Sequence, residues 1–261
     1  MSFFIVSIAS LTILVIVHGL TFLIARRLGR YNVVDVTWGI GFVAVATVCA
    51  AMGTGDAFRR ILLLALVGVW GLRLAWHMVG KSAGKGEDPR YRALLGGDTS
   101  ASNAIRRIFV VQAAAGWFIS LPLQVSSVLG PTPPTMLPVL IVGVALWTLG
   151  FVFEAVGDHQ LRRFKADPAH RGAVLDRGLW AWTRHPNYFG DCCVWWGLWL
   201  VTVADGVSLL TVVSPVLMTY FLVRATGARL TEKQMAGRSG FSEYCSRTSF
   251  FIPKPPKLRL T

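Results

Sequence analysis

Residues 136–156 read MLPVLIVGVALWTLGFVFEAV, an apolar run whose charged side chain, Glu154, lies near its end. A helix of about 20 such residues is long enough to cross the hydrocarbon core of a bilayer. Similar runs recur along the chain, at residues 3–25, 33–52, 60–79, 108–129, 188–204 and 207–226. The pattern therefore predicts an all-α, polytopic membrane helical bundle with about seven transmembrane helices.

The composition of the 261-residue chain agrees with a membrane protein, since 54% of its residues are hydrophobic and 15% are charged. The formal net charge is +13, but the basic side chains lie in loops between apolar runs and form no basic helix or finger for a nucleic-acid groove. We therefore expect membrane lipids as surroundings and no nucleic-acid partner. The cysteines and histidines show no metal-site spacing, so we expect no bound metal.

The distribution of basic residues predicts the orientation of the chain, because Lys and Arg collect in cytoplasmic loops. The loops 130–135 and 204–206 carry no Lys or Arg, and Arg59 and Arg60 are the exceptions to the asymmetry. Basic residues collect after the first, third, fifth and seventh runs, at 26–30, 81–107, 162–184 and in the tail. We expect an N-terminus outside, a C-terminus inside, a retained first span and one integral membrane domain over residues 1–261.

The densest group of polar side chains lies in residues 176–191, which read DRGLWAWTRHPNYFGD. Pro186 disfavours helix at the residue before it, so a turn is expected to present Arg184, His185 and Asn187 together. A guanidinium can bind a phosphate or carboxylate through two hydrogen bonds, and a carboxamide both donates and accepts. A belt of interfacial side chains is the alternative, but this mixture of groups favours a ligand site.

Acidic residues near the apolar runs form two further candidate sites. Glu154, Asp158 and Arg162 have the i, i+4, i+8 spacing of one helix face, which suits either salt bridges or a functional acid at the membrane boundary. Asp35 lies near the start of the second run. It is expected either to pair with Arg73 or to act beside an apolar cavity as a donor to a substrate carbonyl.

Two other groups complete the set of candidate residues. Arg73 and His77 lie one helical turn apart on the third run, and we predict that one of them assists Asp35 in catalysis. The loop 86–91, which contains Glu87, Arg90 and Tyr91, is interpreted as a cytoplasmic lid over the substrate or as a solvated turn.

These residues resemble the signatures of the steroid 5α-reductase-like membrane family, and most closely its bacterial branch of domains of unknown function. The resemblance covers nearly the whole chain and includes the segment 178–190. The other matching motifs are Asp35-x-x-Trp38-Gly39, Arg73-Leu-x-x-His77, Glu87-Asp88-x-Arg90-Tyr91 and the tail Tyr244…Phe251-Ile-Pro253. The resemblance implies a multi-pass protein of the bacterial cytoplasmic membrane.

Steroid 5α-reductases are similar membrane enzymes that use NADPH to reduce a carbon–carbon double bond conjugated to a ketone. The resemblance implies a lipid or sterol-like substrate, with Asp35 as the substrate-facing acid, Trp38 beside the substrate and no clear match for the family's tyrosine partner. In the family's cofactor pattern, Glu154 replaces an Asn and Lys165 an Arg. The implied cofactor residues lie in the half 150–261 and are Asp158, Arg162, Lys165, Arg184, His185, Asn187, Tyr188, Glu232 and Tyr244.

Two alternatives to the reductase remain. The element Arg184-His-Pro-Asn-Tyr188 is also similar to that of membrane isoprenylcysteine carboxyl methyltransferases, which use S-adenosylmethionine and carry an acidic pair that Glu232 and Lys233 echo in part. The third hypothesis is a non-catalytic membrane module that binds anionic lipid through its basic loops.

Overall fold

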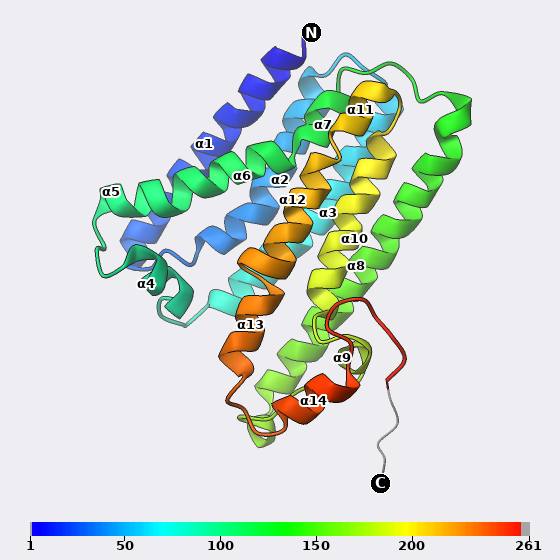
Figure 1. Cartoon of the computed structure of the whole chain (residues 1–261). Coiled ribbons are helices and arrows are strands. Elements are labelled where there is room, and N and C mark those ends of the chain that lie inside the picture. The colour runs from blue at the N-terminus through cyan, green and yellow to red at the C-terminus, as the bar shows by residue number, and fades with distance from the viewer. Residues whose placement is uncertain (1, 257–261) are drawn as a thin grey trace. The chain divides into compact units, whose positions relative to one another are not determined.

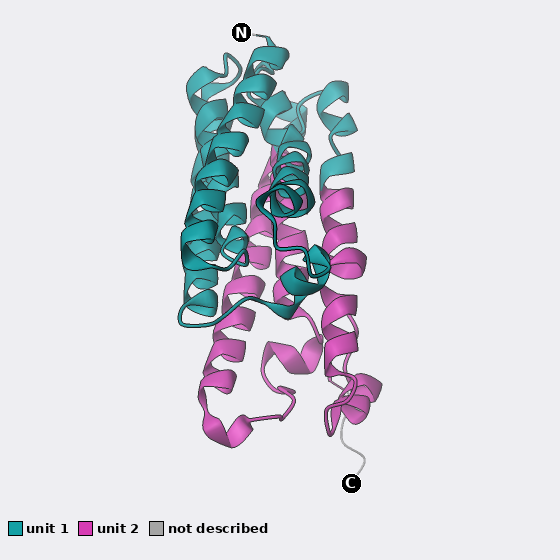
Figure 2. Ribbon diagram, turned by 90° about the vertical axis from the view of Figure 1, so that its left-hand side faces the viewer, with its two compact units in different colours: residues 1–137, 202–214 teal, residues 138–201, 215–261 magenta. Residues whose placement is uncertain are grey.

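The computed structural model describes residues 2–256 and contains helices and turns but no strands over that range, which confirms the all-α class (Figure 1). The chain divides into two compact units, here called unit 1 and unit 2 (Figure 2). Unit 1 comprises Met1–Leu137 and Thr202–Ser214, and unit 2 comprises Pro138–Val201 and Pro215–Thr261. A single domain over the whole chain stays a prediction.

Unit 1 is built around three long helices that follow one another in sequence, α1 (Phe3–Leu28), α2 (Val34–Met52) and α3 (Ala57–Ser82). The predicted run 108–129 is not one straight helix, because it is divided at Ser120, two residues before Pro122. Proline lacks the N–H that a continuous helix needs. The remaining elements are α4 (Pro89–Leu95), α5 (Ala101–Ala104), the short π-helix η1 (Ile105–Phe109), α6 (Val110–Ile119), α7 (Leu121–Ser126), the 3₁₀ turn η2 (Pro134–Met136) and α11 (Gly206–Leu210).

Glycines let α2 and α3 approach closely. A Cβ atom added at Gly71 would lie 2.7 Å from the carbonyl oxygen of Gly39 and from Cγ2 of Val43, and one at Gly39 would overlap the carbonyl oxygen of Gly71. Small residues at such a crossing allow backbones to pack against each other inside a membrane. This crossing positions the helix that carries Asp35 and Trp38.

Unit 2 is organised by α8 (Leu137–Ala166), a continuous helix of 30 residues, and α10 (Pro186–Thr202). The helix α10 begins at Pro186, so His185 lies outside it as predicted, whereas Asn187 lies in its first turn. The other elements are the 3₁₀ turn η3 (Pro168–His170), α9 (Leu179–Trp182), α12 (Val213–Tyr220, which begins in unit 1), the short π-helix η4 (Phe221–Ala225), α13 (Ala228–Met235) and α14 (Phe241–Arg247).

A glycine seam joins α8 to α10. A Cβ atom at Gly150 would lie 2.5 Å from the carbonyl oxygen of Gly190, and one at Gly197 would lie 2.5 Å from the backbone nitrogen of Trp147. Farther along the seam, Gly157 faces the backbone nitrogen of Asn187. The close packing of these two helices therefore extends to the polar residues at the start of α10.

Within residues 2–256, the helical stretches long and apolar enough to cross a membrane are Phe3–Leu28, Val34–Met52, Ala57–Ser82, Pro134–Ala166 and Gly206–Met235. Large apolar side chains such as Phe4, Ile8 and Leu20 are exposed along α1. An exposed apolar face of this length is expected for a surface that contacts lipid. The protein is accordingly a membrane protein, and the number of seven spans and the orientation stay predictions.

Candidate functional site

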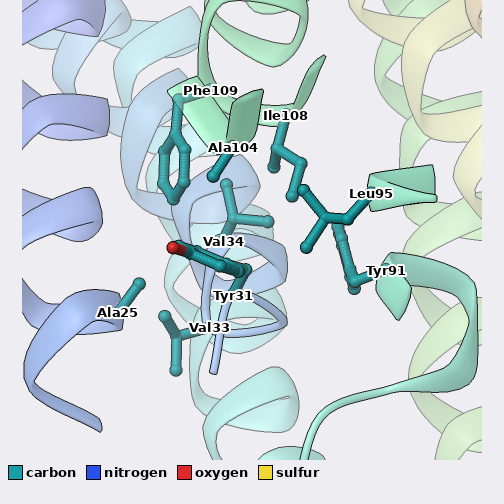
Figure 3. Close-up of a cluster of buried hydrophobic side chains, with 9 residues drawn as sticks. All are labelled: Ala25, Tyr31, Val33, Val34, Tyr91, Leu95, Ala104, Ile108 and Phe109. Carbon is teal, nitrogen blue, oxygen red and sulfur yellow. The ribbon is translucent and has the colours of Figure 1, made fainter. Parts of the chain in front are cut away.

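The helix α4 is a folded element of unit 1. Asp88 caps its N-terminus by accepting a hydrogen bond from the backbone nitrogen of Arg90, and Gly96 closes it with a φ of 62°, in the left-handed region that glycine adopts without strain. Tyr91 and Leu95 are buried in the apolar cluster drawn in Figure 3. The loop 86–91 is interpreted from its sequence as a lid or as a solvated turn. The second interpretation does not apply to Tyr91, because that side chain is buried.

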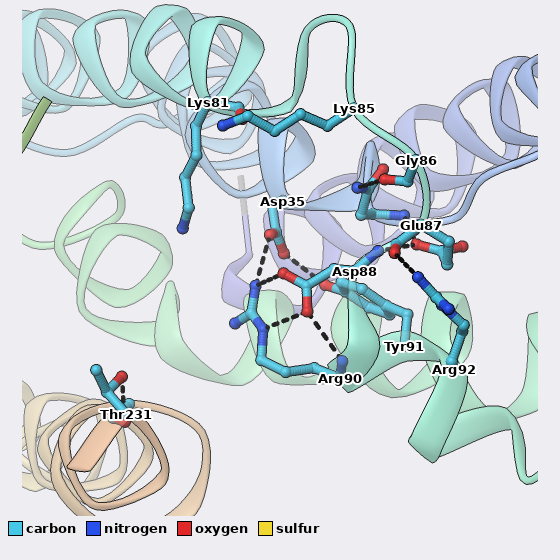
Figure 4. A network of polar contacts seen from close by, with 12 residues as sticks. Asp35, Lys81, Lys85, Gly86, Glu87, Asp88, Arg90, Tyr91, Arg92 and Thr231 are labelled. Atoms are coloured by element: carbon cyan, nitrogen blue, oxygen red, sulfur yellow. Dashed lines mark hydrogen bonds and ion pairs between the residues drawn. The ribbon is translucent and has the colours of Figure 1, made fainter. Parts of the chain in front are cut away.

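The polar residues of α4 meet the start of α2 at Asp35 (Figure 4). The hydroxyl of Tyr91 donates a hydrogen bond to Oδ1 of Asp35 at 2.5 Å, and Nη2 of Arg90 lies 3.3 Å from Oδ2 of the same carboxylate. Arg90 also binds Asp88 at 2.9 Å. The structure thus gives Asp35 a tyrosine and an arginine as partners, both from α4.

Charge and burial tune these groups. Burial raises the pKa of the Tyr91 hydroxyl well above its usual value, and the Asp35 carboxylate raises it further. Burial alone would lower the pKa of Arg90, but Asp88 and Asp35 outweigh burial and raise it. Around neutral pH, Tyr91 therefore keeps its proton and Arg90 its positive charge.

Glu87 anchors α4 to the segment before α2. Its carboxylate accepts hydrogen bonds from the backbone nitrogens of Tyr31, at 2.5 Å, and Asn32, at 3.0 Å. The side-chain amide of Asn32 in turn donates to the carbonyl of Gly86 at 3.0 Å. These bonds hold the segment 86–91 in place, so Glu87 acts through backbone contacts that position Tyr91.

Trp38 continues the site along α2. Its indole nitrogen donates to Oε1 of Gln112, on α6, at 2.9 Å, and Nε2 of Gln112 donates to the Tyr91 hydroxyl at 3.4 Å. Trp38 and Gln112 line a cavity of about 10 Å³ together with His18, Thr37, Leu14, Gly41, Phe42 and Gly116. A cavity of this size holds about one water molecule.

The two other predicted catalytic residues lie on α3, where Arg73 and His77 are half-buried. Their assistance to Asp35 stays a prediction, while Arg90 and Tyr91 are the partners that the structure gives to that acid.

In unit 2, the predicted residues Asp158 and Asn187 meet across the glycine seam. Nδ2 of Asn187 donates to Oδ1 of Asp158 at 3.1 Å, and Oδ1 of Asn187 accepts from the backbone nitrogen of Tyr188 at 3.0 Å. Asp158 and Glu154 are both buried on α8. The amide and the acid, 29 residues apart in sequence, therefore form one polar element.

A second cluster of unit 2 contains Arg184, His185 and Glu232. The Nε atom of Arg184 lies 2.7 Å from Oε1 of Glu232, and Nε2 of His185 lies 3.4 Å from the same oxygen. These pairs are within ion-pair distance, but none of the three atoms is aligned for a hydrogen bond with a partner in residues 2–256. His185 also stacks on Tyr188, with ring centres 5.8 Å apart.

Burial lowers the pKa of His185 to about 3, and the positive charge of Arg184 contributes to the shift. His185 is 3% exposed, so its imidazole is neutral at physiological pH and offers one donor and one acceptor nitrogen. Together with the Glu232 carboxylate, it presents buried polar atoms for a ligand that can both donate and accept.

The C-terminal segment of unit 2 folds back onto this cluster. The backbone nitrogen of Arg184 donates to the carbonyl of Ser249 at 2.9 Å, and the hydroxyl of Thr183 donates to the carbonyl of Phe251 at 2.8 Å. The hydroxyl of Tyr244, on α14, donates to the carbonyl of Trp180 at 2.7 Å. Tyr244 therefore supports the fold of the segment 178–185.

The remaining predicted cofactor residues, Arg162 and Lys165, are exposed near the C-terminal end of α8. Arg162 lies near His159, with Nη2 3.4 Å from Nδ1. Both side chains are therefore accessible from solvent.

The sequence analysis missed two residues that the structure brings into these sites. Gln112 contacts Trp38 and Tyr91, and the signal for it was an amide within an apolar run, which is costly in a membrane unless it has partners. Phe250 receives the guanidinium groups of Arg184 and Arg229 at 5.5 and 4.7 Å from its ring centre. No spacing in the sequence indicated this contact.

Comparisons with known proteins identify the chain at the level of a family. No curated protein and no solved structure matches it. A family model matches residues 21–248 and carries the description protein of unknown function (DUF1295). This match covers α2, α3, α4 and α10 entirely, and with them both polar sites, so the chain belongs to the DUF1295 family.

Proposed function

We propose that the protein is a membrane oxidoreductase that uses NADPH to reduce a carbon–carbon double bond conjugated to a ketone in a lipid or sterol-like molecule. The observation that carries the proposal is the 2.5 Å hydrogen bond between Tyr91 and Asp35. Similar steroid 5α-reductases use a substrate-facing acid and a tyrosine, and Tyr91 supplies the tyrosine that the sequence comparison lacked.

The residues of unit 1 suit the stabilisation of the charge that this reaction creates. Addition of hydride to a double bond conjugated to a ketone places negative charge on the ketone oxygen, which a hydrogen-bond donor stabilises. Tyr91 remains protonated because burial and Asp35 raise its pKa, so its hydroxyl can turn from Asp35 and donate to that oxygen. Asp35 and Arg90, which pair with each other, then balance the charge around the phenol. NADPH, when bound, would supply the hydride.

The residues of unit 2 fit NADPH by the chemistry of their donors and acceptors. Buried Nε2 of His185 and Oε1 of Glu232 have no aligned hydrogen-bond partner among the residues that the structure describes, and a carboxamide can donate and accept at such atoms. Asn187 adds a second amide next to Asp158. Exposed Arg162 and Lys165 suit the negative charge of a dinucleotide's phosphates.

The second candidate function is a lipid methyltransferase that uses S-adenosylmethionine. It is favoured by the convergence of Arg184, His185 and Glu232, because the Arg-His-Pro-Asn-Tyr element and a later acid also occur in isoprenylcysteine carboxyl methyltransferases. A carboxylate at Glu232 would suit the amino group of S-adenosylmethionine. For either function we propose a location in the bacterial cytoplasmic membrane, with the N-terminus outside and the basic loops inside.

Thermal unfolding of the detergent-purified protein with NADPH, NADH and S-adenosylmethionine in parallel tests the proposal. A ligand present at 100 times its dissociation constant stabilises a fold by about 2.7 kcal/mol. We expect a shift with NADPH that Asn187→Ala and Asp158→Ala each abolish. Thr148→Ala, at an exposed position on the same helix α8, should retain it.

Each outcome of this experiment assigns one of the hypotheses. A shift with S-adenosylmethionine alone would replace the reductase with the methyltransferase. If no compound shifts the unfolding temperature, the module that binds anionic lipid through its basic loops becomes the better description, and vesicle binding would then depend on loop charge and not on Asn187.

A further inference from the structure

A chain of three hydrogen bonds runs across unit 1 from Trp38 to Asp35. The indole nitrogen of Trp38 donates to Oε1 of Gln112 at 2.9 Å. The Nε2 atom of Gln112 donates to the hydroxyl oxygen of Tyr91 at 3.4 Å. The Tyr91 hydroxyl donates to Oδ1 of Asp35 at 2.5 Å. The chain links side chains from α2, α6 and α4.

The donors and acceptors at its two ends fix the direction in which these three hydrogen bonds run. An indole N–H can only donate, so the Gln112 atom facing Trp38 must be the carbonyl oxygen, which places the NH₂ group toward Tyr91. Because the Tyr91 oxygen accepts from that NH₂ group, its own proton must point elsewhere. Asp35 receives it, together with the guanidinium of Arg90. Reversal of the bond between Gln112 and Tyr91 would turn the NH₂ group of Gln112 toward Trp38 and leave two donors facing each other.

We propose that Gln112, oriented by Trp38, is a positioning residue that directs the O–H bond of Tyr91 to Asp35. The catalytic importance of this orientation rests on the proposed reductase function, but the orientation itself does not. It keeps the Tyr91 proton at Asp35 before substrate binds, so that the phenol O–H starts from one defined orientation when it turns to a substrate oxygen.

The indole N–H is needed because packing alone does not hold the amide. Gln112 and Trp38 line a cavity of about 10 Å³ together with His18 and Thr37, so one side of the Gln112 side chain borders open space. Rotation of the amide by a half-turn would exchange its oxygen and nitrogen with little change in shape. The Trp38 N–H makes one of these two orientations favourable.

Carbon NMR of the purified protein, labelled with ¹³Cζ-tyrosine and free of cofactor and substrate, tests the proposal. The chain has 5 tyrosines, and Tyr91→Phe identifies the Tyr91 signal by its loss. We expect Gln112→Met, which keeps the side-chain length but removes the carbonyl oxygen and the NH₂ group of the amide, to move this signal and leave the others in place. Trp38→Phe should also move it, although the indole N–H of Trp38 donates to Gln112 and not to Tyr91.

The decisive comparison is the double variant. With Gln112→Met already present, adding Trp38→Phe should leave the Tyr91 signal where Gln112→Met put it, since the effect of the indole passes through the amide. A further movement of the signal in the double variant, or none in either single variant, would overturn the proposal. If Gln112→Met does not fold, Gln112→Leu replaces it. The measurement stands whether or not NADPH binds, so its failure is separate from failure of the reductase assignment.

Discussion

Asn187, at the start of α10, donates its side-chain N–H to the carboxylate of Asp158, in α8, at 3.1 Å. The same helices meet where Gly157 faces the backbone nitrogen of Asn187. A hydrogen bond to a charged group contributes about 1.5–3 kcal/mol to the free energy of unfolding. We therefore expect Asn187→Leu to lower the free energy of unfolding by about 1–3 kcal/mol and to weaken NADPH binding.

Stability and cofactor binding can be separated by a swapped pair. Asp158→Asn combined with Asn187→Asp restores an amide and a carboxylate at the seam and should recover most of the stability in thermal unfolding. Recovery of stability without recovery of NADPH binding would show that the identity of each side chain matters to the cofactor. If Asn187→Leu binds NADPH as the unmodified protein does, Asn187 is not a cofactor residue.

The pairing of Tyr91 with Asp35 predicts a loss of chemistry without a loss of cofactor. General acid assistance typically contributes about 10²- to 10⁴-fold to a rate, so Tyr91→Phe and Asp35→Asn should each lower the rate of NADPH-dependent reduction within that range. The thermal shift caused by NADPH should persist in both variants, because neither residue lies in unit 2.

Arg92→Gln provides the control for these two substitutions. Arg92 is exposed on the same helix α4 and donates to the carbonyl of Glu87 at 2.9 Å, so its loss should leave the rate nearly unchanged. Rates for Tyr91→Phe equal to those for Arg92→Gln would remove Tyr91 from the mechanism.

The sequence indicated one of these two pairs better than the other. Asp158 and Asn187 could be selected from motif positions, and their contact follows from two helices that pack through glycines repeated every seven residues, at Gly143, Gly150 and Gly157 on α8. The partner of Asp35 could not be selected in this way. Tyr91 reaches Asp35 because the cap at Asp88 and the burial of Leu95 dock a short helix, and such tertiary packing has no local signature.

Helix packing in unit 1 predicts opposite outcomes for two glycines on α3. A Cβ atom at Gly71 would lie 2.7 Å from the carbonyl oxygen of Gly39, so Gly71→Ala must push α2 and α3 apart. A Cβ atom added at Gly68 would meet no atom of another described segment within 4 Å, and alanine there has the better helix propensity. We expect Gly71→Ala to destabilise the fold by about 1–3 kcal/mol and Gly68→Ala to be neutral or slightly stabilising.

Thermal unfolding of the two alanine variants, on a shared helix, makes this comparison. Equal unfolding temperatures would show that the α2–α3 crossing yields without cost. Because α2 carries both Asp35 and Trp38, Gly71→Ala should also move the Tyr91 carbon signal, whereas Gly68→Ala should leave it in place.

Arg59 explains one exception in the distribution of basic residues. Its side chain is fully buried and donates to the hydroxyls of Ser126 and Thr132 and to the carbonyls of Ser126, Leu129 and Gly130. A guanidinium enclosed in this way links the end of α7 to the residues that follow it, and it does not face water. The sequence showed the charge of Arg59 but not its burial.

The enclosed guanidinium predicts a large effect on stability. Arg59→Met should leave several of these acceptors without donors, at about 1–3 kcal/mol for each buried group that stays unpaired. Arg27→Met, at an exposed position near the end of α1, is the control and should change the unfolding temperature little. An Arg59→Met protein as stable as the Arg27→Met protein would mean that water satisfies the freed acceptors.

His185 predicts how stability depends on pH. Its pKa falls from 6.5 to about 3 in the folded protein, because burial and the nearby Arg184 disfavour the imidazolium. Between these values the unfolded chain binds a proton that the folded protein does not. Stability is therefore complete above pH 6.5 and decreases as the pH falls toward 3, with a slope from this residue of at most about 1.4 kcal/mol per pH unit.

Replacement of His185 by Gln should remove that slope, because glutamine keeps polar atoms near Glu232 but does not titrate. The measurement is the unfolding temperature between pH 7 and pH 4.5, compared with His159→Gln, whose parent residue is exposed on α8. The His159→Gln protein should retain the pH dependence of the unmodified protein. If His185→Gln retains it as well, the acid sensitivity arises from carboxylates elsewhere, and a neutral imidazole is no longer the basis for placing a ligand amide beside Glu232.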